Sequence, residues 1–191
     1  DNRQDLWVQL TNPNLKWWAE FTYAFQTGDT RTPSHKGYIL PGATRSLTEL
    51  GWSGVISSPQ LVVDNIIWHH IDPTQVGSDY DAYALSHLPF TFENATYKND
   101  LLVGTQTVGQ TDFTIQNPSG FGYWAVDLTI ILYRDTTPVG INTVRLEQVK
   151  PGEARHVSLN WFENPNGVTK TEIEPAVNIL DPQAFLPSER F

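Results

Sequence analysis

The sequence predicts an all-β protein made of two tandem antiparallel β-sandwiches. Three observations support this prediction: apolar and polar residues alternate along many short segments, turn-forming residues separate those segments, and one series of motifs occurs twice. Alternation with a period of two is typical of a half-buried strand, and no segment has a convincing helical period. A series that recurs over this length indicates two copies of one small domain.

The repeated series opens with a short alternating run that ends in Asn-Pro and continues, after a loop, with a Trp and a longer alternating run. It then contains Pro-Gly with an Arg three residues after the glycine, and it closes on Asp-Pro. Because most of these are turn and core residues, the repeat predicts the fold rather than a chemical activity. The paired motifs are Asn12-Pro13 and Asn117-Pro118, Trp17 and Trp124, Pro41-Gly42 and Pro151-Gly152, Arg45 and Arg155, and Asp72-Pro73 and Asp181-Pro182.

The two longer alternating runs determine which side chains should face the cores. Matching Trp17 to Trp124 brings the apolar positions of both runs into phase and directs both indoles inward. Glu20 and Asp127 then point outward, whereas a shift of one residue would bury their carboxylates. This match requires the loop after Asn-Pro to be two residues longer in the second copy.

The individual elements follow from the runs and from the Gly- and Pro-containing turns between them. In the first copy we expect strands near 5–12, 17–26, 36–40, 43–50 and 60–71, and in the second near 101–117, 121–134, 138–148, 153–162 and 168–180. Alternation at Phe90-Thr91-Phe92 allows an earlier start of the second domain, and short helical turns fit 73–86 or 181–187. The expected organisation is a domain at 1–75, a linker at 76–88, and a domain with a C-terminal tail at 89–191.

Composition narrows the classes of partner. The formal net charge of −9 argues against nucleic acid and against adsorption to an anionic membrane, because both partners are negatively charged. No apolar run approaches the ~18 residues of a membrane-spanning helix, so we expect no direct membrane insertion of this segment. Cysteine is absent, which excludes disulfides and thiolate metal sites. Methionine is also absent, and we expect Asp1 to follow a removed or preceding segment such as an anchor.

The second copy carries the motifs of a known family. Asn117-Pro118-Ser119 precedes a bulky strand that ends in Leu132-Tyr133-Arg134-Asp135, and Pro151-Gly152-Glu153 precedes a strand that ends in Trp161-Phe162. This arrangement resembles the FxLyD-type bacterial immunoglobulin-like domain, in which an aromatic strand leads to a Leu-Tyr-Asp-like turn and Pro-Gly-Glu opens the returning strand. Here an Arg stands between the Tyr and the Asp.

The resemblance covers about residues 100–180 well and 5–73 more weakly. The tandem arrangement is similar to uncharacterised proteins of candidate-phylum bacteria, in which an N-terminal membrane anchor precedes two such domains. The resemblance implies two tandem immunoglobulin-like β-sandwiches in an extracellular or cell-envelope setting, tethered by an anchor. It brings no catalytic residues and no cofactor.

Candidate chemical sites in the sequence are weak. His70 and Asp72 share a strand face, but a zinc site needs three or four ligands. Asp79 and Asp81 could offer oxygens to calcium at the domain junction, although the rest of a calcium-binding loop is missing. Glu172 and Glu174 share a strand face, where solvated charges are far more common than a catalytic pair. We therefore predict no catalytic residue, no bound metal and no cofactor.

The seven Trp residues are the most informative candidates for binding. Trp7 and Trp18 fall on outward faces, and Trp52 lies in a Gly- and Ser-containing loop. Exposed Trp can stack on a glycan or contact a protein, and the alternative is packing beneath a loop or a neighbouring domain. We predict a non-enzymatic ectodomain that acts as a stalk, adhesion or assembly module and binds a protein or a surface glycan or associates with itself. The alternatives are a carbohydrate-binding module that uses these Trp and, less favoured, an envelope hydrolase.

Overall fold

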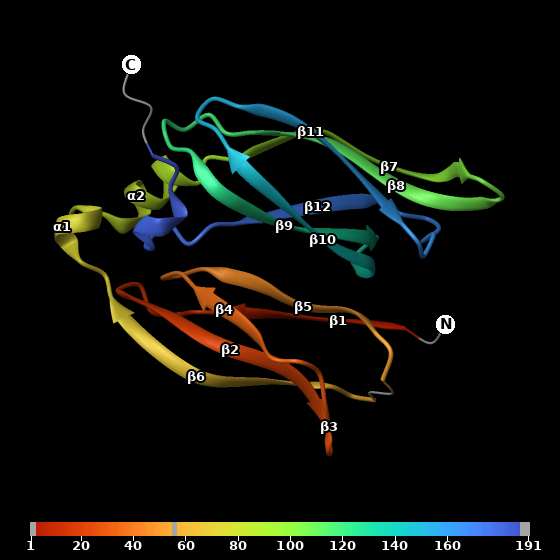
Figure 1. Ribbon diagram of the computed structural model, residues 1–191, viewed down its shortest axis with the longest axis horizontal. Coiled ribbons are helices and arrows are strands. Elements are labelled where there is room, and N and C mark those ends of the chain that lie inside the picture. The colour runs from red at the N-terminus through yellow and green to blue at the C-terminus, as the bar shows by residue number, and fades with distance from the viewer. Residues whose placement is uncertain (1–2, 55–56, 188–191) are drawn as a thin grey trace. The chain divides into compact units, whose positions relative to one another are not determined.

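The computed structural model describes residues 3–54 and 57–187. In this part of the chain all paired strands are antiparallel, and the only helical segments are short, so the predicted all-β fold class is confirmed (Figure 1). The chain divides into two compact units, Asp1–Ser78 and Asp79–Phe191. The division falls within the segment 76–88, most of which forms a helix of the second unit. Helical turns occur in both regions where the sequence allowed them.

Unit 1 contains two sheets that share one core. Strand β1 pairs with β5, and strand β2 pairs with β3 and β4 along one edge and with β6 along the other. Inward side chains from both sheets form a single apolar cluster, which includes Leu6, Phe21 and Leu47, as expected of a β-sandwich. The elements are β1 Gln4–Thr11, β2 Trp17–Thr27, β3 Thr30–Arg31, β4 His35–Ile39, β5 Thr44–Trp52, β6 Gln60–His70 and the helix α1 Pro73–Val76.

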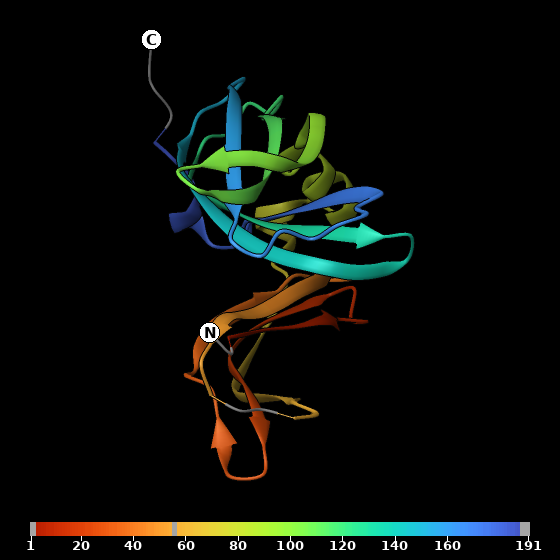
Figure 2. The ribbon, with the colours of Figure 1, turned by 90° about the vertical axis from the view of Figure 1, so that its right-hand side faces the viewer.

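Unit 2 also contains two sheets, each of three strands. Strand β8 lies between β7 and β11, and strand β9 lies between β10 and β12 (Figure 2). The single strand expected at 101–117 is two strands, because Gly104 adopts a positive φ of 63° in the tight turn between them. The elements are α2 Tyr80–His87, β7 Thr91–Val103, β8 Gln106–Gln116, β9 Tyr123–Arg134, β10 Thr137–Val149, β11 Ala154–Trp161, β12 Lys170–Ala176 and the 3₁₀ turn η1 Pro182–Ala184.

The repeated Asn-Pro motif performs the same structural task in both units. Asn12 donates from Nδ2 to the carbonyl of Leu40, the residue before Pro41-Gly42, and its backbone N–H donates to Ala43. Asn117 donates to the carbonyl of Lys150, the residue before Pro151-Gly152, and its backbone N–H donates to Glu153. Both asparagines are buried, at 2% and 1% exposure. Each therefore ties the end of one strand to the turn that opens another.

The repeated Arg also makes an equivalent hydrogen bond in both units. Arg45 donates to the carbonyl of Tyr38, and Arg155 donates to the carbonyl of Gln148. The two pairings of β1 with β5 and of β8 with β11 also agree in register, since Leu10 lies opposite Arg45 and Ile115 lies opposite Arg155. The motif series thus marks positions that are structurally equivalent.

The predicted match between Trp17 and Trp124 is wrong. Asn12 donates to the carbonyl of Trp17, five residues on, whereas Asn117 donates to the carbonyl of Phe121, four residues on. The equivalent of Trp17 is therefore Phe121, and the second loop is one residue shorter, not two residues longer. Neither Trp lies in a core, because Trp17 is 43% and Trp124 is 46% exposed.

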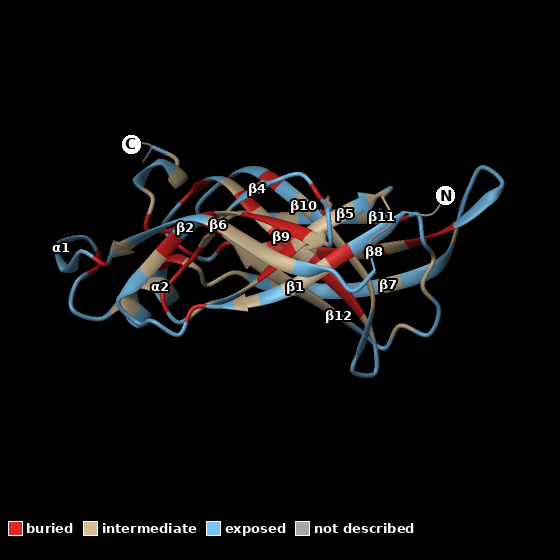
Figure 3. Cartoon of the chain, turned by 90° about the horizontal axis from the view of Figure 1, so that it is seen from below, coloured by how far each residue is buried: buried red, intermediate tan, exposed pale blue. Residues whose placement is uncertain are grey.

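The two Trp are exposed for different local reasons. Trp17 is the first residue of β2 and lies at the end of the sandwich. In β9 the buried side of the strand changes between Tyr123 and Val126, and this change leaves Trp124 outside. From Val126 onward the predicted core face is confirmed, since Val126 and the alternate residues Leu128, Ile130 and Leu132 are buried (Figure 3).

The C-terminal segment, expected as a tail or as a strap lying across the second domain, folds against its own unit. Asp181 caps η1 by accepting a hydrogen bond from the backbone of Gln183. Leu186 then donates to the carbonyl of Gly122, and Phe185 forms an isolated bridge with Tyr123. The segment therefore lies against the start of β9. Pro187 is the last residue of the segment that the structure describes.

Candidate functional site

Trp18 lies on the outward side of β2, as predicted, but it is not freely exposed. Its indole stacks on the imidazole of His69 from β6, with ring centroids 4.3 Å apart and an interplanar angle of 21°. The Nε2 atom of His69 lies 3.0 Å from a carboxylate oxygen of Glu20. The outer face of this sheet therefore carries an ordered row of an indole, an imidazole and a carboxylate.

Trp7 and Trp52 lie elsewhere in unit 1. Trp7 is half-buried on the outward side of β1, where its indole N–H donates to Oγ of Ser46 at 2.9 Å. Trp52 is the last residue of β5 rather than a loop residue, and it packs against the core cluster of the unit. The three predicted Trp thus occupy three different surfaces and do not form one coplanar platform.

Four of the five large exposed apolar side chains in the described part of unit 1 lie on β6 or at the adjacent start of β2, and the fifth, Leu15, lies in the loop before β2. Ile66, Ile67 and Trp68 are 50%, 57% and 47% exposed, and Trp17 lies on the neighbouring strand. We call these four residues the β6 patch. Strand β6 is an edge strand, because it pairs with β2 and with no other strand of the described chain. An apolar patch on a sheet edge is typical of a protein contact surface.

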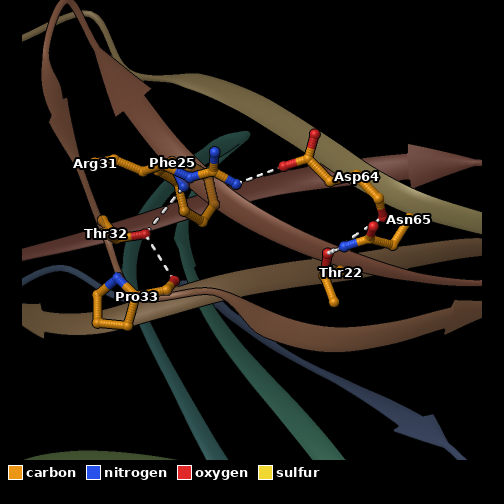
Figure 4. A network of polar contacts seen from close by, with 7 residues as sticks. All are labelled: Thr22, Phe25, Arg31, Thr32, Pro33, Asp64 and Asn65. Carbon is orange, nitrogen blue, oxygen red and sulfur yellow. Dashed lines mark hydrogen bonds and ion pairs between the residues drawn. The ribbon is translucent and has the colours of Figure 1, made fainter.

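A polar network holds β6 next to the patch (Figure 4). Arg31 on β3 pairs with Asp64 at 2.6 Å, and Asn65 donates to Oγ1 of Thr22 on β2 at 3.0 Å. Asn65 has a positive φ of 52°, and the register of β6 against β2 shifts at this point. Such a bulge re-aims the residues that follow it, and here the consecutive residues Ile66 and Ile67 are both exposed.

The acidic candidates serve mainly as helix caps. Asp72 accepts hydrogen bonds from the backbone and hydroxyl of Thr74, and these bonds lower the pKa of its carboxyl group. Asp79 caps α2 by accepting from the backbone of Ala82, and Asp81 lies in the first turn of that helix. Within residues 3–54 and 57–187 no three His, Asp or Glu side chains are grouped so that they could hold a metal ion.

The strand carboxylates and the paired histidines also have structural partners. Glu172 forms an ion pair with Lys170 at 2.7 Å, and this contact raises the pKa of the lysine. Glu174 lies two residues further along β12. His70 packs edge-on against Trp17, with ring centroids 4.9 Å apart. Glu172 is thus paired within its own strand, and His70 packs across to the neighbouring strand β2; in the described structure these residues form no recognisable catalytic arrangement.

An aromatic cluster in unit 2 lies outside the residues that the sequence singled out. The imidazole of His87 is buried between the rings of Tyr83 and Phe121, with centroids 3.9 and 3.8 Å away, and Phe185 packs on its edge. Its Nδ1 lies 2.7 Å from the carbonyl of Tyr83. No local signal could reveal this cluster, because its members come from three distant segments of the chain.

Comparison with known proteins adds no family or relative to this description. No protein-family model matches the chain, and no curated protein matches it. None of the helices in the described residues has the length and apolar character needed to cross a membrane.

Proposed function

We propose that this chain is a non-enzymatic, extracytoplasmic module of a bacterial surface protein, with two immunoglobulin-like units that serve adhesion or assembly. The observation that carries the proposal is the β6 patch. It combines four large apolar side chains with an unpartnered sheet edge, and both features favour association with another protein surface. The candidate carboxylates Asp72, Asp79 and Glu172 act as helix caps or in an ion pair, which supports a binding role over catalysis.

The patch is suited to a protein rather than to a lipid surface. The chain carries a net charge of −9, which opposes contact with an anionic bilayer. Ile67 lies opposite the outward Glu20 and Trp68 lies opposite the buried Ala19, so the two side chains project from opposite faces of the edge strand. A partner that pairs with this strand could contact side chains on both faces. Burial of such side chains yields ~1.5–3 kcal/mol each, enough for several of them to support a specific contact.

Light scattering coupled to size exclusion tests this proposal over a concentration series of the full chain. We expect species larger than the monomer to grow with concentration and Ile67→Lys to abolish that growth. Leu102→Lys is the matched control, because Leu102 is 69% exposed on β7, outside the patch. A monomer at every concentration, with identical behaviour of the two variants, would contradict self-assembly through the β6 patch.

A second function, carbohydrate binding, is favoured by one specific feature. The outward Trp18 lies beside Glu20, whose side chain is 50% exposed and can accept hydrogen bonds from sugar hydroxyl groups. A glycan array compares the native chain with Trp18→Ala. Binding that disappears in the variant supports this function, and an array with no specific signal for the native chain counts against it.

A further inference from the structure

Among the described residues of unit 1, strand β1 lacks a neighbour that its equivalent in unit 2 possesses. Strand β8 is hydrogen-bonded on both sides, to β11 and to β7, whereas in the described residues β1 is bonded to β5 alone. The two strands are equivalent because their Asn-Pro ends and their registers against β5 and β11 agree. Unit 1 therefore has an open edge at the position that β7 occupies in unit 2.

The inward side chains of β1 and β8 differ in burial, because only β8 has a second neighbouring strand in the described structure. Leu10 and Val8 of β1 correspond in register to Ile115 and Phe113 of β8. Ile115 and Phe113 are each 1% exposed, because Phe92 of β7 packs against this side of the sheet. Leu10 and Val8 are only partly buried and lie at the margin of the core cluster. The apolar side of unit 1 is thus incompletely covered where β7 is missing.

The hydrogen-bond pattern shows which amides face the open edge. Residues of antiparallel strands alternate between pairs that exchange hydrogen bonds and pairs that do not. The N–H of Asn12 donates to its register partner Ala43, so the N–H groups of Leu10 and Val8 also point toward β5. The N–H groups of Trp7 and Thr11 consequently point toward the open edge.

Strand β7 indicates which kind of strand could bind to such an edge. It runs antiparallel to β8 and presents its more buried side chains at Phe92 and Tyr97, which pack against Phe113 and Trp161. Phe92 lies opposite Ile115, the equivalent of Leu10. A strand bound in the same way to β1 would place an aromatic ring over Leu10 and Val8.

We propose that the open edge of β1 binds an extended polypeptide strand, antiparallel to β1, that inserts aromatic side chains over Val8 and Leu10 as β7 does over β8. The driving forces are backbone hydrogen bonds along the edge and burial of aromatic rings. The proposal does not depend on the β6 patch, which lies on the other sheet of unit 1.

The test adds a synthetic peptide with the sequence of residues 89–99 to the full chain and follows amide hydrogen exchange by NMR. We expect the amides of Trp7 and Thr11 to exchange at least about tenfold more slowly at saturating peptide, as amides do when they enter a sheet. The amides of β8 should be unchanged. Absence of any saturable change at ~1 mM peptide, or slowing confined to unit 2, would overturn the proposal.

Matched peptides separate strand addition from nonspecific adhesion. By the same alternation, the N–H of Glu93 points toward β8 and that of Phe92 points away, because their partners are Thr114 and Ile115. A peptide N-methylated at Glu93 should therefore fail to bind, and one N-methylated at Phe92 should bind. Equal binding of both peptides would overturn the proposal.

A protein variant provides the reciprocal control. Thr11→Pro removes the edge-facing N–H and should abolish peptide binding, whereas Thr11→Val retains it and should bind. Slowing of the Trp7 and Thr11 amides in concentrated protein without peptide would show that a second copy covers the edge, and it would overturn the assignment of an aromatic-bearing strand as the occupant.

Discussion

Replacement of Asn12 by Ala removes the polar tie that closes one end of unit 1. The side chain is 2% exposed, and its Nδ2 donates to the carbonyls of Trp17 at 2.7 Å and Leu40 at 3.1 Å. Its Oδ1 accepts from the backbone of Asn14 at 3.0 Å. A buried hydrogen bond contributes ~1 kcal/mol net, so loss of all three should lower the free energy of unfolding of unit 1 by about 3 kcal/mol.

Differential scanning calorimetry of the full chain measures this effect. A loss of this size lowers the Tm of a unit of fewer than about 100 residues by roughly 12–24 °C. Asn12→Ala should shift the transition of unit 1, and Asn117→Ala, at the equivalent buried position, should shift the other transition. Tryptophan fluorescence identifies unit 1, which contains five of the seven Trp.

Asn14→Ala is the control, because Asn14 is exposed and its side chain makes one hydrogen bond, to Asn12. It should lower the free energy of unfolding by less than ~1 kcal/mol. A shift below about 0.5 kcal/mol for both Asn12→Ala and Asn117→Ala, or a shift of the same transition by both, would refute the view that the two residues are equivalent ties of separate units.

Three further predictions concern single residues. Burial raises the pKa of the Tyr123 hydroxyl to about 12, so the stability that this neutral hydroxyl contributes is complete below pH ~10 and should be lost as the pH rises toward 12. The loss should reach up to about 3 kcal/mol. Urea unfolding at pH 9 and 11.5 should show this loss, and Tyr123→Phe should reduce it. A Cβ atom at Gly37 would lie 2.5 Å from the ring of Phe21, so Gly37→Ala should destabilise unit 1 by ~1–3 kcal/mol, measured by urea unfolding against Gly28→Ala, where no atom lies within 4 Å and only the positive φ opposes the change. Arg45→Leu should lower the Tm of unit 1 detectably, because it removes the bond to the carbonyl of Tyr38 and the contact of the guanidinium with that ring at 3.8 Å.

Local patterns predicted much of the fold. Period-two alternation located five of the six strands of unit 1 within one or two residues, because each has a more buried face, and it missed the two-residue strand β3. The Asn-Pro and Pro-Gly motifs identified equivalent positions because their backbone hydrogen bonds are made close to the turns they define. Glu20 and Asp127 point outward as predicted and pair with His69 and Arg145 on neighbouring strands.

What the sequence could not predict depends on long-range packing. The change of buried side in β9 leaves Trp124 exposed, and alternation alone gives no sign of it. Ile66 and Ile67 are ordinary strand residues in the sequence, and their exposure results from the bulge at Asn65 and from the edge position of β6. The candidate binding residues Trp7, Trp18 and Trp52 were recognisable by type, but their separation onto three surfaces required the pairing of the strands.

Amide hydrogen exchange of the free chain tests the central structural claim most directly, namely that unit 1 presents an open edge where unit 2 carries β7. We predict that the amides of Trp7 and Thr11 exchange much faster than those of their β8 equivalents Asp112 and Gln116, while the amides of Val8 and Leu10 remain protected by β5. Protection of Trp7 and Thr11 equal to that of Asp112 and Gln116 in the dilute monomer would contradict the account, because β1 would then already have a second neighbouring strand.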